Sequence, residues 1–549
     1  MEDVSAASRA DRHQQWLEQV DAALRTSGLE AAARLALTAL AEGVEEPTFL
    51  NLAASAHYNE GRFDEAVQLL TRARSLAPDD PNILNSLGIC LKALGQTAAA
   101  LEAFDDALRI DPRMAPAHFN RGEVFDDLND VAASRSAYLQ AISLEPYYIE
   151  ALASLAWIEA QAGDAASART LGERALALWP RDALARMALA SAALQQGDLP
   201  GAAAHLMPLS RDPKLTTINR SIALGLTGDL LDAEGRPAHA FEMYRASNAQ
   251  LHALYADRFA AGESALARAN RLISWFETAD RGQWRAAEPP VSSDENPKSH
   301  IFLVGFPRSG TTLLENILAS HPEVISLEEK DCLGPSSETY LASDEGLGRL
   351  SRINSEESAR ERGAYWGKVR SYGIDPRGKV FIDKLPLASL QLPLIAKLFP
   401  DARVLFAVRD PRDVVLSCFR RRFAMNSAMF ELLTLRGAAV YYDAVMRLSG
   451  VYRDLLPLPE HIVRYEDLLE DFEGTARVVC DFLGLEWDQA LFDFAAKART
   501  RGIGTPSAAQ VVRGLNRDGQ GVWRRYREQM APVLPILEPW VERFGYTSE

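Results

Sequence analysis

Residues 301–321 read IFLVGFPRSGTTLLENILASH, and this stretch decides the expected fold of the second half of the chain. Residues 301–305 are mostly apolar and indicate a buried strand, whereas residues 312–320 have the pattern of a helix. Gly305 and Gly310 bracket the tight loop between them. Backbone N–H groups can turn inward in such a loop, and the positive end of the helix dipole adds to their field. We therefore expect this corner to bind an anionic group.

The loop is similar to a Walker A motif but lacks its lysine, because Thr311 stands before the final Thr312 in PRSGTT. Arg308 supplies a fixed positive charge, and Ser309, Thr311 and Thr312 add hydroxyl donors around Gly310. This set suits a phosphosulfate better than a magnesium-bridged triphosphate. A nucleotide kinase is thus the weaker enzymatic interpretation, and an ordinary strand–turn–helix corner is the structural alternative.

The bulk composition excludes several classes of protein. A chain of 549 residues with 47% hydrophobic residues should form more than one domain. Its net charge of −16 argues against a nucleic-acid or anionic-membrane partner. No apolar stretch reaches the ~20 residues of a membrane span, and we expect no signal peptide and a cytoplasmic location. No metal site is expected, because the four cysteines are scattered and lack zinc spacing: Cys90, Cys332, Cys418 and Cys480.

The first half of the chain repeats with a period of 34 residues. Prolines recur at that spacing, namely Pro78, Pro112, Pro146 and Pro180. Small residues recur in phase with them, namely Ala66, Ala100, Ser134, Ala168 and Ala202. This period is typical of helical-hairpin repeats, in which small residues let two helices approach each other.

The repeat pattern resembles the tetratricopeptide family over about residues 50–213. The resemblance implies an all-α solenoid whose concave surface could hold a peptide or protein acceptor, although a spacer or a dimerisation module fits equally well. Homo-oligomerisation therefore stays open. Composition changes at residues 286–299, where AAEPPVSSDENPKS interrupts the helical pattern. We expect a helical domain over 1–285, a linker over 286–299 and an α/β domain over 300–549.

A second strand, turn and helix follow at residues 402–418, which read ARVLFAVRDPRDVVLSC. Arg409 stands at the end of this strand, and Ser417 follows two helical turns later, so both can reach one phosphate. The alternative is a salt-bridged turn formed by the alternating arginines and aspartates of RDPRD.

Together, PRSGTT and RDPRDVVLS resemble the sulfotransferase family, and the resemblance extends from residue 298 to the end of the chain. It implies a P-loop-like α/β domain with a central parallel sheet and 3′-phosphoadenosine 5′-phosphosulfate as co-substrate. The first motif would hold the 5′-phosphosulfate and the second the 3′-phosphate. Tyrosylprotein sulfotransferases are the most similar branch, together with bacterial proteins that join tetratricopeptide repeats to such a domain.

That resemblance also implies a reaction and its residues. Glu329 in HPEVISLEEK corresponds to the general base, with Glu328 as its neighbour and alternative. A carboxylate is favoured because none of the three histidines after residue 299 is well placed. Lys384, at the end of the strand expected over residues 380–383, corresponds to the catalytic lysine, which would neutralise the charge that develops on the leaving bisphosphate. Arg308 would contribute to the same neutralisation. Asp331 replaces an arginine that helps acidic substrates, which weakens the expectation of an acidic-tyrosine preference.

Further matches complete the expected cofactor pocket, namely Tyr465, Ser507, Gln510, Asn516 and Arg524, with Arg525 as the alternative to Arg524. The acceptor is expected to be a tyrosine hydroxyl of a peptide or protein. A carbohydrate, lipid or small phenol is the alternative within the same reaction. A repeat scaffold with a catalytically dead nucleotide-binding domain is the alternative of another class.

Overall fold

The computed structural model describes residues 2–128, 130–284, 297–501 and 507–547. By packing, the chain divides into two compact units. The first holds residues 1–158 and 167–185, and the second holds residues 159–166 and 186–549. Most of the expected linker at 286–299 lies outside the described residues, so its conformation and the domain boundaries drawn around it stay predictions.

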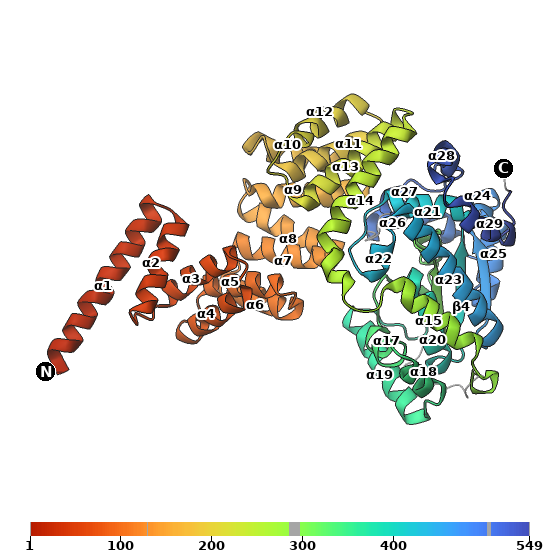
Figure 1. The fold of residues 1–549 in the computed structure, drawn as a ribbon, viewed down its shortest axis with the longest axis horizontal. Helices are drawn as coiled ribbons and strands as arrows, with labels where there is room; N and C mark the ends of the chain where they lie inside the picture. Colours follow the sequence, from red (N-terminus) through yellow and green to blue (C-terminus); the bar gives the residue numbers. More distant parts are fainter. Residues whose placement is uncertain (1, 129, 285–296, 502–506, 548–549) are drawn as a thin grey trace. The chain divides into compact units, whose positions relative to one another are not determined.

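Antiparallel helices make up the first unit, and successive helices pack together as hairpins (Figure 1). Gly61 and Gly95 stand at the hairpin turns with positive φ of 74° and 72°, which glycine adopts at little cost. Gly88 lets two helices approach closely, because a Cβ at this position would lie 2.5 Å from the ring of Phe104. The helices are α1 (Glu2–Thr26), α2 (Leu29–Ala41), α3 (Pro47–Asn59), α4 (Phe63–Leu76), α5 (Pro81–Ala93), α6 (Thr97–Ile110), α7 (Ala115–Asp127), α8 (Val131–Leu144), α9 (Ile149–Ala162) and α10 (Ala165–Leu178).

The second unit begins with more helices, and the last of them share a core with the sheet that follows. Phe276 and Trp284 are buried in the same apolar cluster as Phe302 of the first strand. The rings of Phe276 and Tyr452 meet edge to face at 5.0 Å. These helices are α11 (Ala183–Gln195), α12 (Leu199–Ser210), α13 (Thr217–Ala233), α14 (Pro237–Ala260), α15 (Ala265–Glu277) and the 3-10 turn η1 (Arg281–Trp284).

Within the described residues, five parallel strands form the sheet in the order β2-β3-β1-β4-β5, which confirms the expected central parallel sheet. The chain leaves β1 towards β2 on one side and leaves β4 towards β5 on the other. The carboxyl ends of β1 and β4 therefore flank a topological switch point, where open α/β sheets bind their ligands. The strands are β1 (Ser299–Gly305), β2 (Val324–Glu328), β3 (Val380–Lys384), β4 (Arg403–Val408) and β5 (Glu460–Arg464).

Apolar side chains cover both faces of this sheet. Phe302 and Val304 of β1 belong to one buried cluster, whereas Ile301 and Leu303 belong to another. Such burial on both faces is typical of a parallel sheet. The covering elements are α16 (Thr311–Leu318), α17 (Gly334–Tyr340), α18 (Asp344–Ser351), α19 (Ser355–Ser371), η2 (Pro386–Gln391), α20 (Leu392–Leu398), α21 (Pro411–Arg420), α22 (Ser427–Glu431), α23 (Leu435–Leu455), α24 (Tyr465–Glu470), α25 (Phe472–Leu483), η3 (Gln489–Asp493), α26 (Phe494–Arg501), α27 (Ala508–Val511), η4 (Val522–Tyr526), α28 (Arg527–Met530) and α29 (Leu534–Arg543).

No helix within the described ranges combines the length and the apolar character that a bilayer crossing requires.

A buried chain of polar groups ties α19 to the sheet. The Tyr365 hydroxyl donates to Asp383 Oδ2 at 2.7 Å, and His300 Nε2 lies 2.9 Å from the same hydroxyl. Burial raises the pKa of Asp383 to about 7, although the Tyr365 hydrogen bond opposes this shift. Burial also lowers the pKa of His300 to about 3, so the imidazole is neutral in the folded protein.

The raised pKa of Asp383 predicts a pH dependence of stability. Below pH 7 the folded state keeps a proton on Asp383 that the unfolded chain releases above about pH 4. Unfolding therefore becomes easier as the pH rises between these values. The stability of the wild type relative to Asp383→Asn should fall by roughly 2–4 kcal/mol from pH 4.5 to pH 7.5.

Urea unfolding followed by tryptophan fluorescence measures this difference, because Trp366 lies 4.9 Å from the His300 ring. The comparison with Asp383→Asn removes the contribution of His300, which is present in both proteins. An equal difference at the two pH values would contradict the prediction.

Candidate active site

The loop after β1 is a tight turn that leaves no room for a side chain at Gly305 or Gly310, the two glycines that bracket it. A Cβ on Gly305 would lie 2.6 Å from the carbonyl oxygen of Ala407 on the neighbouring strand. Gly310 has a φ of 100°, and a Cβ there would lie 2.8 Å from the ring of Tyr465. Arg308 itself adopts a φ of 71°, which is uncommon outside glycine and is often found at functional sites. Helix α16 begins directly afterwards at Thr311, so its amino end faces this loop.

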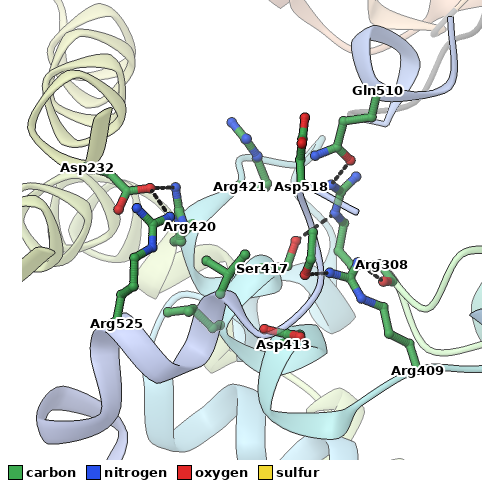
Figure 2. A pocket seen from close by; sticks show the side chains of 13 residues that line it. Asp232, Arg308, Arg409, Asp413, Ser417, Arg420, Arg421, Gln510, Asp518 and Arg525 are labelled. Atoms are coloured by element: carbon green, nitrogen blue, oxygen red, sulfur yellow. Dashed lines mark hydrogen bonds and ion pairs between the residues drawn. The ribbon is translucent and has the colours of Figure 1, made fainter. Parts of the chain in front are cut away.

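Arg308 connects three segments that are far apart in the sequence (Figure 2). Its Nε donates to Ser417 Oγ at 2.9 Å, and its Nη2 donates to Gln510 Oε1 at 3.0 Å. Its Nη1 donates to Ser507 Oγ. Burial, and the neighbouring charges of Arg421 and Arg409, lower the pKa of Arg308. The structure thus gathers four of the residues that the sequence assigned to the cofactor.

Arg409 reaches the same place from the end of β4. It donates to the carbonyl oxygen of Arg308 at 3.3 Å and to that of Gly519. Its guanidinium lies 4.7 Å above the ring of Tyr465, which in turn packs against Gly310. Arg308 and Arg409 therefore line one pocket at the carboxyl ends of β1 and β4.

The pocket contains charged residues that the sequence analysis did not single out. Arg420 and Arg421 belong to the run FRRRF at the end of α21, and this run was a signal that could have been used. Asp232 comes from α13, and the sequence around it gives no hint of a site. The lining residues are Asp232, Arg308, Arg409, Asp413, Leu416, Ser417, Arg420, Arg421, Gln510, Asp518, Gly519, Val522 and Arg525.

Asp413 fixes the segment that contacts Arg409 through hydrogen bonds to the backbone. Its two oxygens accept hydrogen bonds from the backbone N–H groups of Gly521 at 2.6 Å and Trp523 at 2.9 Å. Burial raises the pKa of Asp413 to about 6, although the nearby charge of Arg409 opposes the rise. The carboxylate thus anchors the segment whose Gly519 carbonyl receives Arg409.

Four of the residues expected at the cofactor line the pocket, namely Arg308, Arg409, Ser417 and Gln510, and the others, Asn516 and Arg524 among them, do not. Asn516 donates to the carbonyl oxygen of Gly514 at 2.9 Å and belongs to a local turn. Arg524 lies 5.4 Å from the ring of Trp523, whereas the neighbouring Arg525 lines the pocket.

A second charged group lies at the ends of β2 and β3. Lys384 is fully buried, and its Nζ lies 2.8 Å from Glu329, 3.3 Å from Glu315 and 3.5 Å from Glu328. Burial alone would lower the pKa of Lys384, but the charges of these three carboxylates outweigh it and raise the pKa. The ammonium is therefore fixed in place and charged.

Glu329 differs from Glu328 in exposure and backbone. Its side chain is 30% exposed against 17% for Glu328, and it lies nearer to Lys384. Its φ of 46° turns the chain out of β2, while its N–H still donates to the Lys384 carbonyl oxygen at 2.8 Å.

Glu315 was missed at the sequence level. It is fully buried and accepts a hydrogen bond from Ser326 at 2.9 Å. The signal available was a single acid within the apolar pattern TTLLENIL. Because Glu315 stands one turn after Thr311, helix α16 joins the loop after β1 to Lys384.

Two buried polar atoms in the pocket region fit an anionic ligand. Ser309 Oγ and Arg409 Nε are both buried, and neither has a hydrogen-bond partner within the described part of the chain. Buried polar groups of this kind are costly unless a partner arrives. The oxygens of a phosphate or phosphosulfate could accept from both. In the same described part, no three histidine, cysteine or acidic side chains are grouped to hold a metal ion. The expectation that the protein has no metal site stays a prediction.

Family models match both halves of the chain. Residues 300–489 match the model of the sulfotransferase family. Residues 45–113, 87–149 and 154–206 match models of the tetratricopeptide repeat.

Individual relatives resemble the chain at modest identity. An uncharacterized protein of Aquifex aeolicus is 28% identical over 248 residues, covering 44% of this chain and 32% of that protein. The chain thus spans about a third of the length of that relative. Protein-tyrosine sulfotransferase 1 of Danio rerio is 24% identical, covering 51% of this chain and 80% of its own length. Protein-tyrosine sulfotransferase A of Caenorhabditis elegans is 25% identical over 45% of this chain and 67% of its own.

Among solved structures, a tetratricopeptide repeat protein from Parabacteroides merdae covers 43% of this chain and 93% of its own, at 16% identity and a TM-score of 0.34.

The two lysine ion pairs predict different costs of charge removal. Lys384→Met would leave three clustered carboxylates without their buried cation, and we expect a loss of about 3–5 kcal/mol of stability. Lys298 pairs with Glu323 at 2.7 Å on the surface, so Lys298→Met is the matched control and should cost less than about 1 kcal/mol. Urea midpoints of the two variants test this, and equal losses would contradict it.

Proposed function

The chain joins tetratricopeptide repeats to a sulfotransferase domain, and we propose that this domain transfers a sulfuryl group from 3′-phosphoadenosine 5′-phosphosulfate to an acceptor hydroxyl. One observation carries the proposal. Arg308 and Arg409 come from the loops after the adjacent strands β1 and β4, and both line one pocket. Two arginines at a topological switch point suit a ligand with two anionic groups.

The residues around each arginine divide the binding of the donor. The loop N–H groups, Arg308 and the hydroxyls of Ser309, Thr311 and Thr312 would hold the 5′-phosphosulfate. Arg409 and Ser417 would hold the 3′-phosphate, with Arg421 and Arg525 added by their place in the pocket. When bound, the donor supplies an activated sulfuryl group. The other proposed cofactor contacts are Gly310, Tyr465, Ser507 and Gln510, and, with less support from their positions, Asn516 and Arg524.

The ends of β2 and β3 would supply the chemistry. Glu329 accepts the acceptor's hydroxyl proton as that oxygen bonds to sulfur, and its greater exposure favours it over Glu328. Lys384 and Arg308 offset the negative charge that develops as the bond from sulfur to the bisphosphate breaks. Because Lys384 Nζ lies 2.8 Å from Glu329, one ammonium both orients the base and stabilises the leaving charge.

For the acceptor we propose a tyrosine of a peptide or protein, which the repeats could hold. Two of the relatives are named protein-tyrosine sulfotransferases, and tetratricopeptide repeats commonly bind proteins. A carbohydrate, lipid or small phenol is the alternative, because no described contact selects an aromatic ring. The cytoplasmic location stays a prediction, supported by four free, buried cysteines.

Calorimetry with adenosine 3′,5′-bisphosphate tests the donor site. The wild type should bind, and Arg409→Ala should weaken binding by roughly 2–3 kcal/mol because a charged hydrogen-bonding group is lost. Arg477→Ala is the matched control, since Arg477 pairs with Glu473 on the surface and should leave binding unchanged. A wild type that does not bind the bisphosphate would end the proposal of an enzyme.

Incubation with ³⁵S-labelled donor and a cell lysate tests the base and the acceptor together. Glu329→Gln should lower labelling by at least about 100-fold while the bisphosphate affinity stays within about tenfold, because only proton transfer is lost. Glu328→Gln is the control and should retain most of the activity. Full activity of Glu329→Gln would move the role of base elsewhere, and label in small molecules rather than in protein would overturn the tyrosine assignment.

A further inference from the structure

Helix α13 contributes acidic residues to the nucleotide pocket. Asp229 and Asp232 stand one turn apart on this helix, and Asp232 lines the pocket itself. Both lie outside residues 300–489, which match the sulfotransferase family, and outside the stretches that match tetratricopeptide repeats. No sequence motif therefore assigns them a role.

The two carboxylates hold three arginines of the pocket, and Figure 2 shows the contacts of Asp232 with Arg420 and Arg525. Asp232 Oδ2 accepts from Arg420 Nη2 at 2.7 Å and from Arg525 Nη2 at 3.1 Å. Asp229 Oδ2 accepts from Arg421 Nη1 at 3.1 Å. The arginines come from the end of α21 and from η4, so α13 is the element that connects them.

The hairpin of α13 and α14 is packed firmly enough to fix these carboxylates. Asn248 of α14 donates to the carbonyl oxygen of Phe419, at the end of α21, at 2.9 Å. The rings of Phe241 and Phe419 stack at 5.0 Å. Tyr244 donates to Asp229 Oδ1 at 2.8 Å, and its ring lies 5.1 Å from the Arg420 guanidinium. Asp229 is thus oriented from both helices.

Two of the three arginines need a partner to fix their position, because their side chains are partly exposed to solvent. The side chain of Arg525 is 49% exposed and that of Arg421 is 36% exposed. A long exposed side chain samples many rotamers, and fixing it costs up to about 2 kcal/mol. A partner that fixes it before the ligand arrives removes that cost from binding.

We propose that Asp229 and Asp232 are positioning residues of the nucleotide site, which hold Arg420, Arg421 and Arg525 towards the 3′-phosphate of the donor. This inference rests on the proposed function. It makes the hairpin of α13 and α14 part of the site, although the hairpin lies outside the matched sulfotransferase segment. A carboxylate beside a phosphate can also repel it and so weaken binding. Positioning and repulsion predict opposite changes in nucleotide affinity when the carboxylate is removed.

Binding of two nucleotides to the full-length protein separates these effects. Adenosine 3′,5′-bisphosphate carries the 3′-phosphate, and adenosine 5′-monophosphate lacks it. Asp232→Asn should weaken the bisphosphate by about tenfold and the monophosphate by less than about twofold. A purely structural role would affect both nucleotides alike. Glu242→Gln on α14 is the matched control, because Glu242 pairs with Arg245 on the surface and should change neither affinity.

Arg525→Gln provides a second route that does not disturb a buried group. It should weaken the bisphosphate selectively, and adding Asp232→Asn to it should weaken binding by less than the product of the two single effects, because both act through one contact. Thermal unfolding of each variant shows whether it is folded. If Asp232→Asn does not fold, Arg525→Gln alone still decides, since an unchanged bisphosphate affinity overturns the proposal.

The outcomes also separate this inference from the proposed function. A wild type that binds the bisphosphate but is unaffected by Asp232→Asn refutes only the positioning role. Tighter binding by Asp232→Asn shows repulsion and also refutes it. A wild type that binds neither nucleotide refutes the donor site, and the positioning role with it.

Discussion

Burial of the Arg308 guanidinium is the constraint on which the site depends. Arginine keeps its charge inside proteins, so a buried guanidinium must find acceptors or destabilise the fold. Arg308 finds them in Ser417, Ser507 and Gln510, which belong to segments more than a hundred residues away. Satisfying one charge therefore draws two distant parts of the chain, around Ser417 and around Ser507 to Gln510, to the carboxyl end of β1, and it is there that the pocket forms.

The neighbouring ends of β2 and β3 also hold a buried cation, but its partners are charged rather than neutral. Here the buried cation is an ammonium, and carboxylates rather than neutral oxygens surround Lys384. Helix α16 connects the two arrangements, because its first turn follows the loop that holds Arg308 and Glu315 in its second turn contacts Lys384.

The helices before the sheet are not a separate module in the second unit. Phe276 and Trp284 share the core of the sheet, and Asn248 binds the end of α21. By packing, the division of the chain falls near residue 186, a hundred residues before the segment where the composition changes. Side chains from the helical hairpin can therefore reach the pocket, which a linear division into repeat and enzyme would not suggest.

The sequence by itself determined the local features of this protein. The 34-residue period predicted the hairpins, and the apolar runs up to Gly305 and Val408 predicted two buried strands followed by turns and helices, because backbone geometry and burial act over a few residues. The parallel arrangement of the strands followed from the resemblance to the sulfotransferase family. Only the tertiary structure decided that Arg525 rather than Arg524 lines the pocket, that Glu315 contacts Lys384, and that Asp232 joins the site. Such contacts depend on which faces meet when distant segments pack together. The local pattern of the sequence does not specify which faces these are.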